Sequence, residues 1–559
     1  MDKIWLKSYS PGVPETVDAS EYSSITDLFE QSVERFHQRP AYSNFGHDLS
    51  FDDVDRLTRH FAAYLTGELS LKKGDRIAIM MPNVLQYPVA LFAALRAGLI
   101  VVNVNPLYTA RELEYQLNDS GAVAIIVLEN FAHTLAEVVD KTAIRHVIIT
   151  QVGDLFGFPA SFIVNGVIKY VKKMVPDFVI PNAIHLHDAL ATGAELTFSR
   201  VEQNLDDIAF LQYTGGTTGV SKGAILTHRN MVSNLLQAYV WASSALKDGE
   251  EVSITALPLY HIFALTANAL FAMKIGARSV LITNPRDFPA FVKTLRQEHF
   301  SIFVGINTLF NALLHTPGFE QLDFSSLKFT LGGGMAVQRS VAEQWKQVTG
   351  NTLIEAYGLT ETSPAVCINP VNIPAYTGAI GLPLPSTDVS IRSKDGKEKA
   401  IGETGELWVK GPQVMRGYWQ HDGDTQKTLT DGGWLHTGDV ARMDEHGFVY
   451  IVDRLKDMIL MSGFNVYPNE IEAVIAAHPK VLEAGVIGVA DPGSGEAVVA
   501  IVVKADQTLD EEELRVYCHK NMTGYKCPKH IIFADTLPKT NVGKILRREL
   551  RQQYGDKIK

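Results

Sequence analysis

Cysteine is scarce in this chain: Cys367, Cys518 and Cys527 are the only three among 559 residues. Three scattered cysteines cannot build a disulfide framework or a cysteine-rich metal cluster, so both kinds of small stabilised protein are excluded. We expect them to be buried thiols in a reducing compartment. The first residues also lack the apolar stretch of a secretion signal, which predicts a cytoplasmic protein.

A long hydrophobic run is also missing. The longest candidate, residues 77–104, is interrupted by Asn83, Gln86 and Arg96, which argues against a membrane-spanning helix. The pattern instead predicts a strand over 76–80, a turn at 82–83, a helix over 86–97 and a strand over 101–104. The chain contains no low-complexity tract and no short-period repeat.

Basic charge is not in excess either. The 51 Lys and Arg residues are outnumbered by 62 Asp and Glu residues, giving a net charge of −11. This balance argues against broad nucleic-acid binding. A hydrophobic content of 46% with 20% charged residues is typical of a soluble globular enzyme. The length exceeds what one hydrophobic core usually serves, so we expect at least two domains.

The order of expected elements indicates where those domains lie. Apolar strands at 123–128, 146–150 and 208–212 alternate with helical segments, which predicts βαβ units and parallel sheets. The pattern changes near residue 453, just after an expected strand at 447–452. Beyond this point we expect a compact α+β unit, with strands at 481–489 and 497–503 and helices within 466–479 and 510–522. The sequence therefore predicts an N-terminal domain over 1–453, a linker at 454–456 and a C-terminal domain over 457–559.

A glycine- and threonine-rich loop at residues 213–223 (YTGGTTGVSKG) is suited to holding phosphate. Glycines let the backbone approach an anion, and successive N–H groups form an anion-binding concavity. It is not a Walker A loop, because Ser221 stands where that motif has glycine before lysine. A flexible connector is the alternative for the loop taken alone. The expected nucleotide contacts are Tyr213, Thr214, Gly215, Gly216, Thr217, Thr218, Gly219 and Lys222.

Five further motifs follow in order along the chain. They are PLYHIF (258–263), YGLTETSP (357–364), GWLHTGD (433–439), DRLKD (453–457) and PKTNVGKILR (538–547). The ordered set resembles the adenylate-forming superfamily of acyl-CoA synthetases, peptide-synthetase adenylation domains and luciferases. Residues 3–9 (KIWLKSY) and 459–472 resemble bacterial long-chain fatty acyl-CoA synthetases in particular. The resemblance implies an α/β fold with a large N-terminal domain of packed sheets and flanking helices, a hinge at 454–456, and a small mobile α+β cap.

The resemblance also implies an activity. A long-chain fatty acid is activated by ATP to acyl-AMP with release of pyrophosphate, and CoA then displaces AMP, feeding fatty acid degradation or lipid synthesis. Because an anionic carboxylate must approach an anionic phosphate, catalysis depends on positioning and on positive charge, with Mg²⁺ as the expected cofactor. Three alternatives remain open: a ligase that loads a carrier protein, an aryl or medium-chain acid:CoA ligase, and an inactive adenylate-binding or membrane-scaffolding protein.

The catalytic residues implied by the family are few. Lys544 matches the lysine that bridges the carboxylate and the α-phosphate, whereas a lone lysine so near the end would be a solvated charge. Glu361 matches the Mg²⁺ ligand and Thr360 a contact to the α-phosphate; a glutamate paired with a helix dipole is the alternative for Glu361. His261 matches a residue that borders the acyl site and positions substrate. We expect Lys539, Arg547 and Arg548 to be solvated neighbours of Lys544.

The remaining matches surround the nucleotide and CoA. Tyr357 offers an aromatic face for adenine, and a carboxylate at Asp439 can accept both ribose hydroxyls. Arg454 matches an arginine that contacts ribose and phosphate. Isolated from the motif set, these residues would be a core tyrosine, a turn aspartate and a surface ion pair. The expected contacts also include Gly333, Gly334 and Gly358 beside the nucleotide and Ser462 and Gly463 beside the pantetheine channel.

The acyl chain and the membrane are the last expectations. Apolar segments 259–271 and 301–305 would wall an acyl tunnel, but the tryptophan gate of some long-chain members has no counterpart in 261–268. The spacing of apolar residues predicts an amphipathic helix over 161–175 that either lies in a membrane interface or packs on the domain. We expect peripheral attachment to the cytoplasmic face of the inner membrane; the oligomeric state is open. The predicted apolar face comprises Ile163, Val164, Val167, Ile168, Val171, Met174 and Val175, flanked by Lys169, Lys172 and Lys173.

Overall fold

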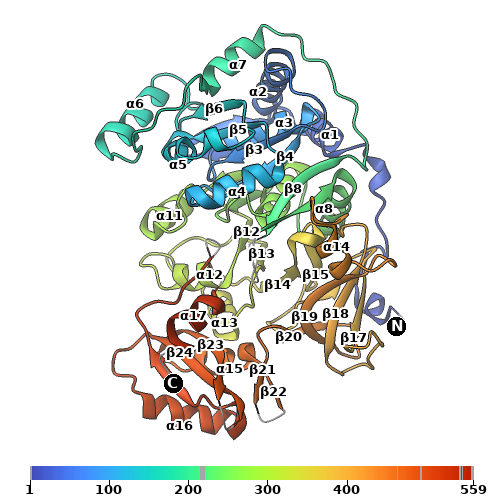
Figure 1. Ribbon diagram of the computed structural model, residues 1–559, viewed down its shortest axis with the longest axis vertical. Helices are drawn as coiled ribbons and strands as arrows, with labels where there is room; N and C mark the ends of the chain where they lie inside the picture. The colour runs from blue at the N-terminus through green and yellow to red at the C-terminus, as the bar shows by residue number, and fades with distance from the viewer. Residues whose placement is uncertain are drawn as a thin grey trace.

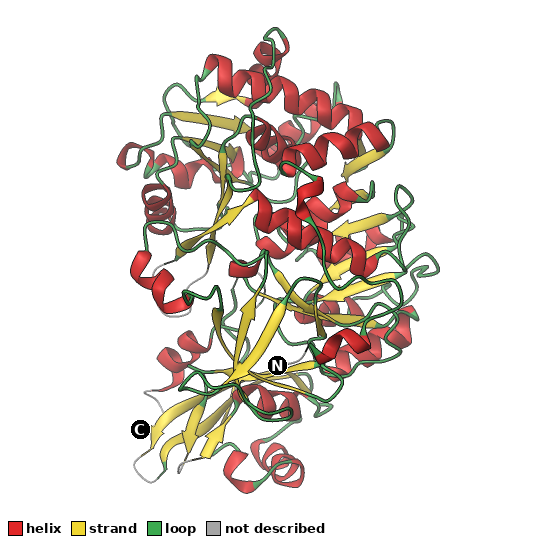
Figure 2. Ribbon diagram, turned by 90° about the vertical axis from the view of Figure 1, so that its right-hand side faces the viewer, coloured by secondary structure: helices red, strands yellow, loops and turns green. Residues whose placement is uncertain are grey.

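Four β-sheets organise the molecule (Figure 1). The computed structural model of the chain describes residues 3–214, 221–461, 464–491, 494–540, 543 and 545–555. Two large sheets, of seven and nine strands, form the upper body, and sheets of four and five strands follow toward the C-terminus. Figure 2 shows the helices gathered around the large sheets, whereas strands dominate the lower part of the molecule. The predicted α/β class, with an α+β C-terminal part, is confirmed.

The seven-stranded sheet has the order β7-β6-β5-β3-β4-β8-β9 and is parallel except for the β8–β9 pair. Its central strands are buried on both faces, as is usual for parallel sheets covered by helices. The strands expected within residues 76–150 and from 208 onward are confirmed. The strand bounds are β3 Arg76–Met80, β4 Ile100–Asn103, β5 Ala124–Leu128, β6 His146–Thr150, β7 Ile184–His185, β8 Ile208–Thr214 and β9 Lys222–Thr227.

The nine-stranded sheet has the order β16-β15-β14-β13-β12-β10-β11-β1-β2. All pairings from β14 to β1 are parallel, so the carboxyl ends of β10, β12, β13 and β14 lie at one edge. In open parallel sheets ligands bind beyond this edge. The strand bounds are β1 Pro40–Asn44, β2 His47–Ser50, β10 Val252–Thr255, β11 Arg278–Leu281, β12 Ile302–Gly305, β13 Phe329–Gly332, β14 Leu353–Gly358, β15 Ala365–Ile368 and β16 Leu382–Pro383.

Helices cover both large sheets. Helix α3 (Gln86–Arg96) is buried along its whole length, which explains why residues 77–104 are apolar although they form β3, α3 and β4. None of the helices within the described ranges is long and apolar enough to cross a bilayer. The other helices of the body are α1 Ile25–Phe36, α2 Phe51–Ala63, α4 Ala110–Ser120, α5 Ala132–Ala136, α7 Leu186–Ala194, α8 His228–Ala242, α9 Ile262–Ala264, α10 Phe271–Lys274, α11 Phe288–Leu295, α12 Asn307–Leu314, α13 Arg339–Thr349 and α14 Asp422–Thr428.

The four-stranded antiparallel sheet joins the body to the C-terminal part. It comprises β17 Asp388–Arg392, β18 Gly405–Lys410, β19 Leu435–Met443 and β20 Val449–Arg454. The beginning of the chain packs against it: Trp5 is buried, and a Cβ atom built on Gly447 would lie 2.4 Å from the Cα atom of Trp5. Lys3 pairs with Asp388 at 2.8 Å. Residues 3–9 are therefore an integral part of the fold.

The C-terminal unit is a five-stranded sheet with helices on its faces. Its strands are β21 Ile459–Met461, β22 Phe464–Val466, β23 Val481–Asp491, β24 Gly495–Lys504 and β25 His530–Phe533, and its helices are α15 Pro468–Ala476, α16 Glu511–Asn521 and α17 Arg547–Tyr554. Buried side chains on both sides of β23 and β24 give it cores of its own. The linker expected at 454–456 starts at Arg454, the last residue of β20, and ends before β21 begins at Ile459. All three cysteines are buried, as predicted.

The amphipathic segment expected at 161–175 is a short helix, α6 (Ala160–Gly166), that continues as a π-helical turn, η6 (Val167–Val171). The predicted apolar face is divided between the core and solvent. Val164 and Ile168 pack against the main core, whereas Ile163, Val167, Val171 and Met174 are exposed. The prediction that these residues share one apolar face is therefore wrong. Val164 and Ile168 face the core, whereas Ile163, Val167 and Val171 face solvent.

Candidate active site

The glycine- and threonine-rich loop connects two paired strands of the seven-stranded sheet. Strands β8 and β9 are antiparallel, with Thr214 paired opposite Lys222, so the chain returns as a strand and not as the helix of a Walker A loop. The hydroxyl of Ser221 donates to the carbonyl oxygen of Thr214 at 2.5 Å and closes the base of the turn. The residues of the turn itself, Gly215, Gly216, Thr217, Thr218 and Gly219, lie outside the described residues.

Lys222 follows this turn and is held in a defined place. Its Nζ atom lies 2.7 Å from a carboxylate oxygen of Asp424 and 5.4 Å from the centre of the Tyr418 ring. The ammonium group of Lys222 lowers the pKa of Asp424, which stands in the first turn of α14. A phosphate brought to Lys222 would therefore meet a cation that is already oriented, and it would compete with Asp424 for it.

Tyr418 connects Lys222 to Glu361. Its hydroxyl donates to Oε1 of Glu361 at 2.7 Å, and burial followed by this carboxylate raises the pKa of Tyr418. Residues 416–419 run beside β9, where the N–H of Trp419 donates to the carbonyl oxygen of Gly223 at 2.8 Å. The sequence analysis missed Tyr418, because its place depends on this pairing between distant segments and no motif surrounds it.

Glu361 and Thr360 lie just beyond the carboxyl end of β14, in the short 3₁₀ turn Thr360–Thr362, after Gly358 ends the strand. The hydroxyl of Thr266 donates to the carbonyl oxygen of Ser363 at 2.8 Å and fastens this turn to the helical segment that follows His261. Within the described ranges no group of three or more His, Cys, Asp or Glu side chains could hold a metal ion. Glu361 alone still fits Mg²⁺, which is commonly bound by one or two carboxylates plus substrate phosphates and waters.

Two of the predicted nucleotide residues converge on the carboxylate of a third, Asp439. The hydroxyl of Tyr357 donates to Oδ2 of Asp439 at 2.5 Å, and Nε of Arg454 lies 3.2 Å from Oδ1 of the same side chain. The β19–β20 pairing sets Asp439 directly opposite Arg454. Burial and the Asp439 charge raise the pKa of Tyr357. Asp439 is thus buried but fully ion-paired and hydrogen-bonded, which is the condition under which a buried charge is tolerated.

The glycines after β13 lie next to this group. A Cβ atom on Gly333 would be 3.0 Å from the ring of Phe263 and 3.2 Å from the carbonyl oxygen of Ala356, so a side chain there would press on both. Gly334 has a φ of +72°, which disfavours any other residue. Packing at Gly333 and backbone conformation at Gly334 therefore favour glycine beside the strand that carries Tyr357, and the nucleotide contact of both residues stays a prediction.

His261 is the N-cap of α9, where its Nδ1 atom accepts from the N–H of Phe263 at 3.3 Å. Two buried polar side chains, one from β8 and one from α3, hold the preceding loop. The amide of Gln212 donates to the carbonyl oxygen of Tyr260, and the hydroxyl of Tyr87 donates to the carbonyl oxygen of Leu259, both at 2.8 Å. His261 is positioned by its own backbone and by this network.

The side chain of Tyr213 is part of the core. Its ring packs within the hydrophobic cluster on the outer face of the seven-stranded sheet, and its hydroxyl donates to Oδ2 of Asp119 at 2.5 Å. Burial and Asp119 together raise the pKa of Tyr213. A contact between Tyr213 and a nucleotide would have to come from its backbone.

The C-terminal unit reaches the same sheet edge. Residues 538–540 run antiparallel to residues 545–546: Lys539 pairs with Ile545 as a β-bridge, and the N–H of Leu546 donates to the carbonyl oxygen of Pro538 at 2.8 Å. We call this segment the 538–546 hairpin. A Cβ atom on Gly543 would lie 2.6 Å from the hydroxyl of Thr308, at the start of α12. The hairpin therefore touches the body just beyond β12. Lys544, Ser462 and Gly463 lie outside the described residues.

Arg547 is not the solvated neighbour that was expected. Its guanidinium lies 2.7 Å from Glu472, 3.3 Å from Asp457 and 3.5 Å from Asp453, and its side chain is only 13% exposed. The prediction is wrong because three carboxylates of the linker region and α15 converge on this position in the fold. Lys539 is also paired, with Glu483 at 2.5 Å, whereas Arg548 is exposed as predicted.

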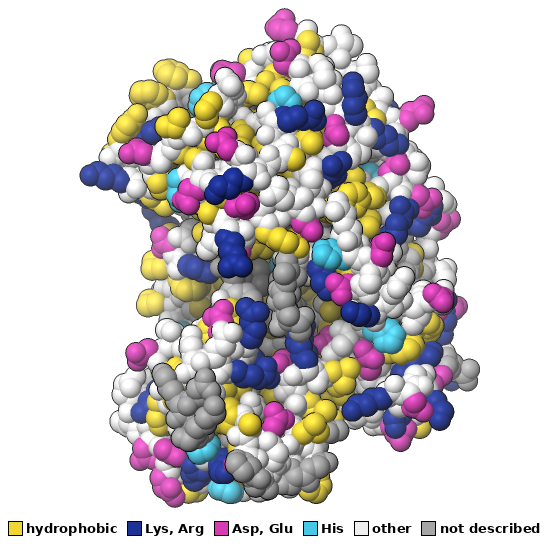
Figure 3. Space-filling model, viewed as in Figure 1, with side chains coloured by type: hydrophobic (Ala, Val, Ile, Leu, Met, Phe, Trp, Pro, Cys, Tyr) yellow, Lys and Arg dark blue, Asp and Glu magenta, His cyan; other side chains and the backbone are white. Residues whose placement is uncertain are grey.

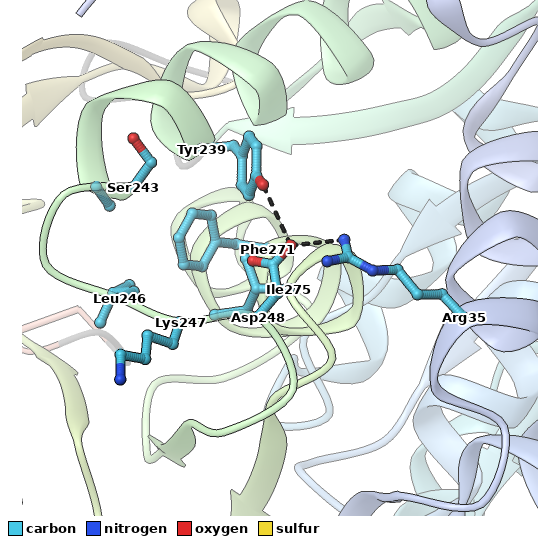
Figure 4. Close-up of a pocket in the computed structure, with 9 residues that line it drawn as sticks. Arg35, Tyr239, Ser243, Leu246, Lys247, Asp248, Phe271 and Ile275 are labelled. Atoms are coloured by element: carbon cyan, nitrogen blue, oxygen red, sulfur yellow. Dashed lines mark hydrogen bonds and ion pairs between the residues drawn. The ribbon is translucent and has the colours of Figure 1, made fainter. Parts of the chain in front are cut away.

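A cavity of about 350 Å³ lies away from the nucleotide groups (Figure 4). Its walls come from α1, the end of α8 and the region of α10. In Figure 4, Arg35 and Tyr239 both point toward Asp248, which they contact at 2.6 Å and 3.2 Å. The cavity lies at the far end of the helical segment that begins after His261 and runs through α9, η7 (Leu265–Leu270) and α10. Its apolar lining is Ala242, Leu246, Phe271 and Ile275.

Comparisons with known proteins agree with this geometry. The family described as "AMP-binding enzyme" matches residues 29–419, and the "AMP-binding enzyme C-terminal domain" matches residues 470–544. The chain is similar to the long-chain-fatty-acid–CoA ligase of Yersinia pestis, with 56% identity over 99% of this chain and 98% of the relative, and to that of Haemophilus influenzae, with 53% identity over 99% of each. The crystal structure of ATP-bound MatB from Rhodopseudomonas palustris is similar with a TM-score of 0.83 and 28% identity, covering 96% of this chain and 100% of that one.

Proposed function

This chain belongs to the AMP-binding enzyme family as a long-chain fatty acid–CoA ligase, and from that premise we propose how its residues divide the reaction. It activates a long-chain fatty acid with ATP and transfers the acyl group to CoA. The observation that supports the assignment of roles is the convergence of Lys222, Glu361 and Asp439 with the hairpin 538–546 around the carboxyl edge of the nine-stranded sheet.

In the first half-reaction the nucleotide is held from three sides. Asp439 accepts hydrogen bonds from ribose hydroxyls, Tyr357 offers its ring to adenine, and Arg454 neutralises Asp439 and reaches toward phosphate. Thr360 and the hairpin turn at 214–219 donate to phosphate oxygens beside Lys222. Since the fatty carboxylate is already ionised, no general base is needed, and His261 positions the acyl group. These residues contribute orientation and positive charge where the two anions meet.

Lys544 completes this arrangement. It follows Gly543, which lies beside Thr308, and its ammonium group would lie between the carboxylate oxygen and the α-phosphate. Mg²⁺, when bound, would be held by Glu361 together with phosphate oxygens and waters, and it would withdraw charge from the phosphates. Tyr418 keeps the Glu361 carboxylate in one orientation through its hydrogen bond.

In the second half-reaction CoA attacks the acyl-AMP. We place the change between the two half-reactions at the hinge 454–456, about which the C-terminal unit (457–559) turns relative to the body (1–453). Ser462 and Gly463, which follow β21 in the sequence, would then replace the 538–546 hairpin and line the pantetheine path. Residues 455–456 lie between two separate sheets, so a rotation there would break no strand pairing, and Arg454 would stay paired with Asp439.

The acyl chain would follow the helical segment from His261 to the cavity beside Phe271. Segments 259–271 and 301–305, which we expected to wall the tunnel, are almost entirely buried and apolar in the fold. We further propose that the enzyme attaches peripherally to the cytoplasmic face of the inner membrane, because its substrate partitions into bilayers. A homo-oligomer is compatible with this assignment but is not required by it.

Separate assays of the two half-reactions test the assignment. Lys544→Ala should lower acyl-AMP formation by roughly 100-fold or more, as expected for loss of a charge that acts in the transition state, while supplied acyl-AMP and CoA are still converted to thioester. Equal loss of both half-reactions would remove Lys544 from a role in adenylation alone. Lys539→Ala, in the same hairpin but paired with Glu483, is the matched control and should leave both rates near wild type.

Glu361→Gln provides a second arm of the same assay. The variant should need a higher Mg²⁺ concentration for adenylation, because the amide is a weaker ligand than the carboxylate it replaces. An unaltered Mg²⁺ dependence would remove Glu361 from the metal site and leave the role of Lys544 untouched.

A further inference from the structure

The segment around α6 and η6 exposes an apolar surface. Of the 18 large hydrophobic side chains that are exposed among the described residues, eight fall within residues 158–179, so they form a concentration and not the usual scatter. We call this the α6–η6 surface. Its members are Phe158 (91% exposed), Phe162 (76%), Ile163 (57%), Val167 (37%), Tyr170 (75%), Val171 (74%), Met174 (55%) and Val179 (82%). Figure 3 shows apolar side chains gathered at this corner of the molecule, where Figure 1 places α6.

The exposure does not arise from a loose segment. Asn165, on the opposite side of the helix, accepts from the N–H of Gly153 at 2.7 Å and donates to Gln151 at 3.0 Å and to Asp154 at 3.1 Å. Val164 and Ile168 pack against the main core. The helix is therefore fastened by one side, and its outward side is apolar although water normally selects polar residues there.

The charge of this segment is opposite to that of the chain. Residues 158–179 contain three lysines and one acidic residue, Asp177, whereas the whole chain has a net charge of −11. Lys169, Lys172 and Lys173 are all exposed. Lys169 approaches a carboxylate, that of Glu129, only at 3.9 Å. Exposed aromatic and aliphatic side chains bordered by lysines on a short helix have the chemistry of an interfacial membrane anchor.

We propose that the α6–η6 surface is where this enzyme docks on an anionic phospholipid bilayer. The apolar side chains would enter the boundary between headgroups and acyl chains, and the lysines would meet lipid phosphates. A second copy of the chain is a poorer occupant, because a twofold contact would set the same lysines opposite one another. The inference rests on the peripheral attachment proposed above and specifies its surface.

Vesicle co-sedimentation with purified full-length enzyme tests the surface. Two variants divide its contributions: Phe162→Ser/Tyr170→Ser/Val171→Ser removes apolar area, and Lys169→Gln/Lys172→Gln/Lys173→Gln removes charge. Val516→Ser, at an exposed apolar position on α16, is the matched control. The vesicles are phosphatidylcholine alone and phosphatidylcholine mixed with phosphatidylglycerol, each at low and high salt.

The apolar variant should bind the mixed vesicles at least about 10-fold more weakly, because burial of one large apolar side chain in the bilayer strengthens binding by about 10-fold. The lysine variant should lose roughly 100-fold on the mixed vesicles, since each basic residue near an anionic surface contributes about fivefold, and it should lose little on phosphatidylcholine alone. High salt should weaken wild-type binding to the mixed vesicles. The control should bind like wild type, and all proteins should keep their activity on a soluble shorter acid.

Three outcomes would contradict the inference in different ways. Wild-type protein that binds neither vesicle would overturn the attachment itself, while the ligase activity measured in solution would stand. Wild-type binding that both variants retain would show that another surface docks. Variants that change the sedimentation coefficient of the free protein without changing vesicle binding would identify the surface as a contact between copies of the chain.

Discussion

At the scale of single residues, the site is built from polar groups that already hold one another. Lys222 is paired with Asp424, Glu361 with Tyr418, and Asp439 with both Tyr357 and Arg454. Each charged group is therefore oriented before substrate arrives, which lowers the reorganisation required during the reaction. The consequence is competition: ribose and phosphate must displace or share these internal partners.

Glu355, two residues before Tyr357 on β14, is a buried carboxyl that the mechanism does not use. It is 7% exposed, and its Oε2 atom has no hydrogen-bond partner. Burial raises the pKa of Glu355 to about 8, against which the N–H of Gly378 and the charge of Arg339 act only partly. The side chain is therefore protonated in the folded enzyme at neutral pH but ionised in the unfolded chain.

Glu355→Gln should stabilise the protein, and more so as pH rises. Below the unfolded pKa of 4.5 both states carry the proton and the variant should resemble wild type. Between that value and about 8 only the unfolded state releases the proton, so the free energy of unfolding of the wild type falls with rising pH. The glutamine variant does not titrate and should therefore be more stable than wild type by about 2–4 kcal/mol at pH 7.5. Thermal midpoints of both proteins from pH 4.5 to 8 provide the measurement.

Glu320→Gln, at an exposed carboxylate, is the control and should show a small difference that does not vary with pH. A constant difference between the Glu355 variant and wild type over this range would mean that Glu355 is ionised in the fold.

At the scale of elements, one helical segment connects the reaction centre to the cavity. It starts at Ile262 after His261, continues through the π turn η7 and ends at Lys274, about 20 Å away at 1.5 Å per residue. Helix α8 runs from the end of β9 to Ala242 on the cavity wall. The segment Ile262–Lys274 thus has one end at the site and the other at the cavity, whereas α8 begins after Thr227, at the end of β9 opposite to Lys222. This arrangement suits a substrate whose reactive carboxyl and terminal methyl are far apart.

Ala242→Phe should shorten the acyl chains that the enzyme accepts. A phenyl ring in the cavity would displace the last methylenes of a long chain, and each methylene contributes about 0.8 kcal/mol, so kcat/KM for a long acid should fall roughly 10-fold or more. Activity on an eight-carbon acid should change little. A panel of saturated acids assayed for acyl-CoA formation gives the profile.

Ser243→Ala, which lies on the same wall but does not fill the cavity, is the control. Equal losses for short and long acids in the Ala242 variant would show that the acyl chain does not reach this cavity.

At the scale of the whole molecule, the C-terminal unit presents the 538–546 hairpin, and not the β21–β22 hairpin, to the body. Gly543 of the 538–546 hairpin lies against Thr308, whereas Leu460 and Phe464 of the β21–β22 hairpin are exposed. Phe464 stacks on Tyr525 with ring centres 5.0 Å apart. In this arrangement only the hairpin that carries Lys544 is near the site, so the other hairpin requires a rotation of the unit to reach it.

Lys456→Pro should hinder that rotation. Residues 454–457 form a turn in which the N–H of Asp457 donates to the carbonyl oxygen of Arg454 at 3.1 Å, and proline would fix φ at residue 456 near −65°. We expect thioester formation from supplied acyl-AMP to fall while acyl-AMP formation is less affected. Lys456→Ala removes the side chain without restricting the backbone and should affect both steps less. Wild-type rates of both half-reactions in the proline variant would place the pivot elsewhere.

The sequence by itself determined the elements and the reacting groups. The helix and the two strands within residues 76–104, the strand at 146–150 and the two long strands after residue 481 could be predicted, because apolar periodicity and turn residues act locally. For the loop at 213–223 the closely spaced glycines and hydroxyls predict phosphate binding, which stays a prediction. The ordered motifs after it identified the family.

Only the tertiary structure decided which of these groups meet. Tyr418 lies between Lys222 and Glu361 because residues 416–419 pair with β9, and no local pattern encodes such a pairing. Arg547 is buried because three carboxylates from separate segments surround it. Which apolar residues of α6 face solvent depends on how the helix is rotated about its axis against the core. A small rotation would exchange the buried and the exposed apolar residues. Contacts between distant segments depend on sheet register and helix rotation, which a sequence pattern constrains only to a face and not to a partner.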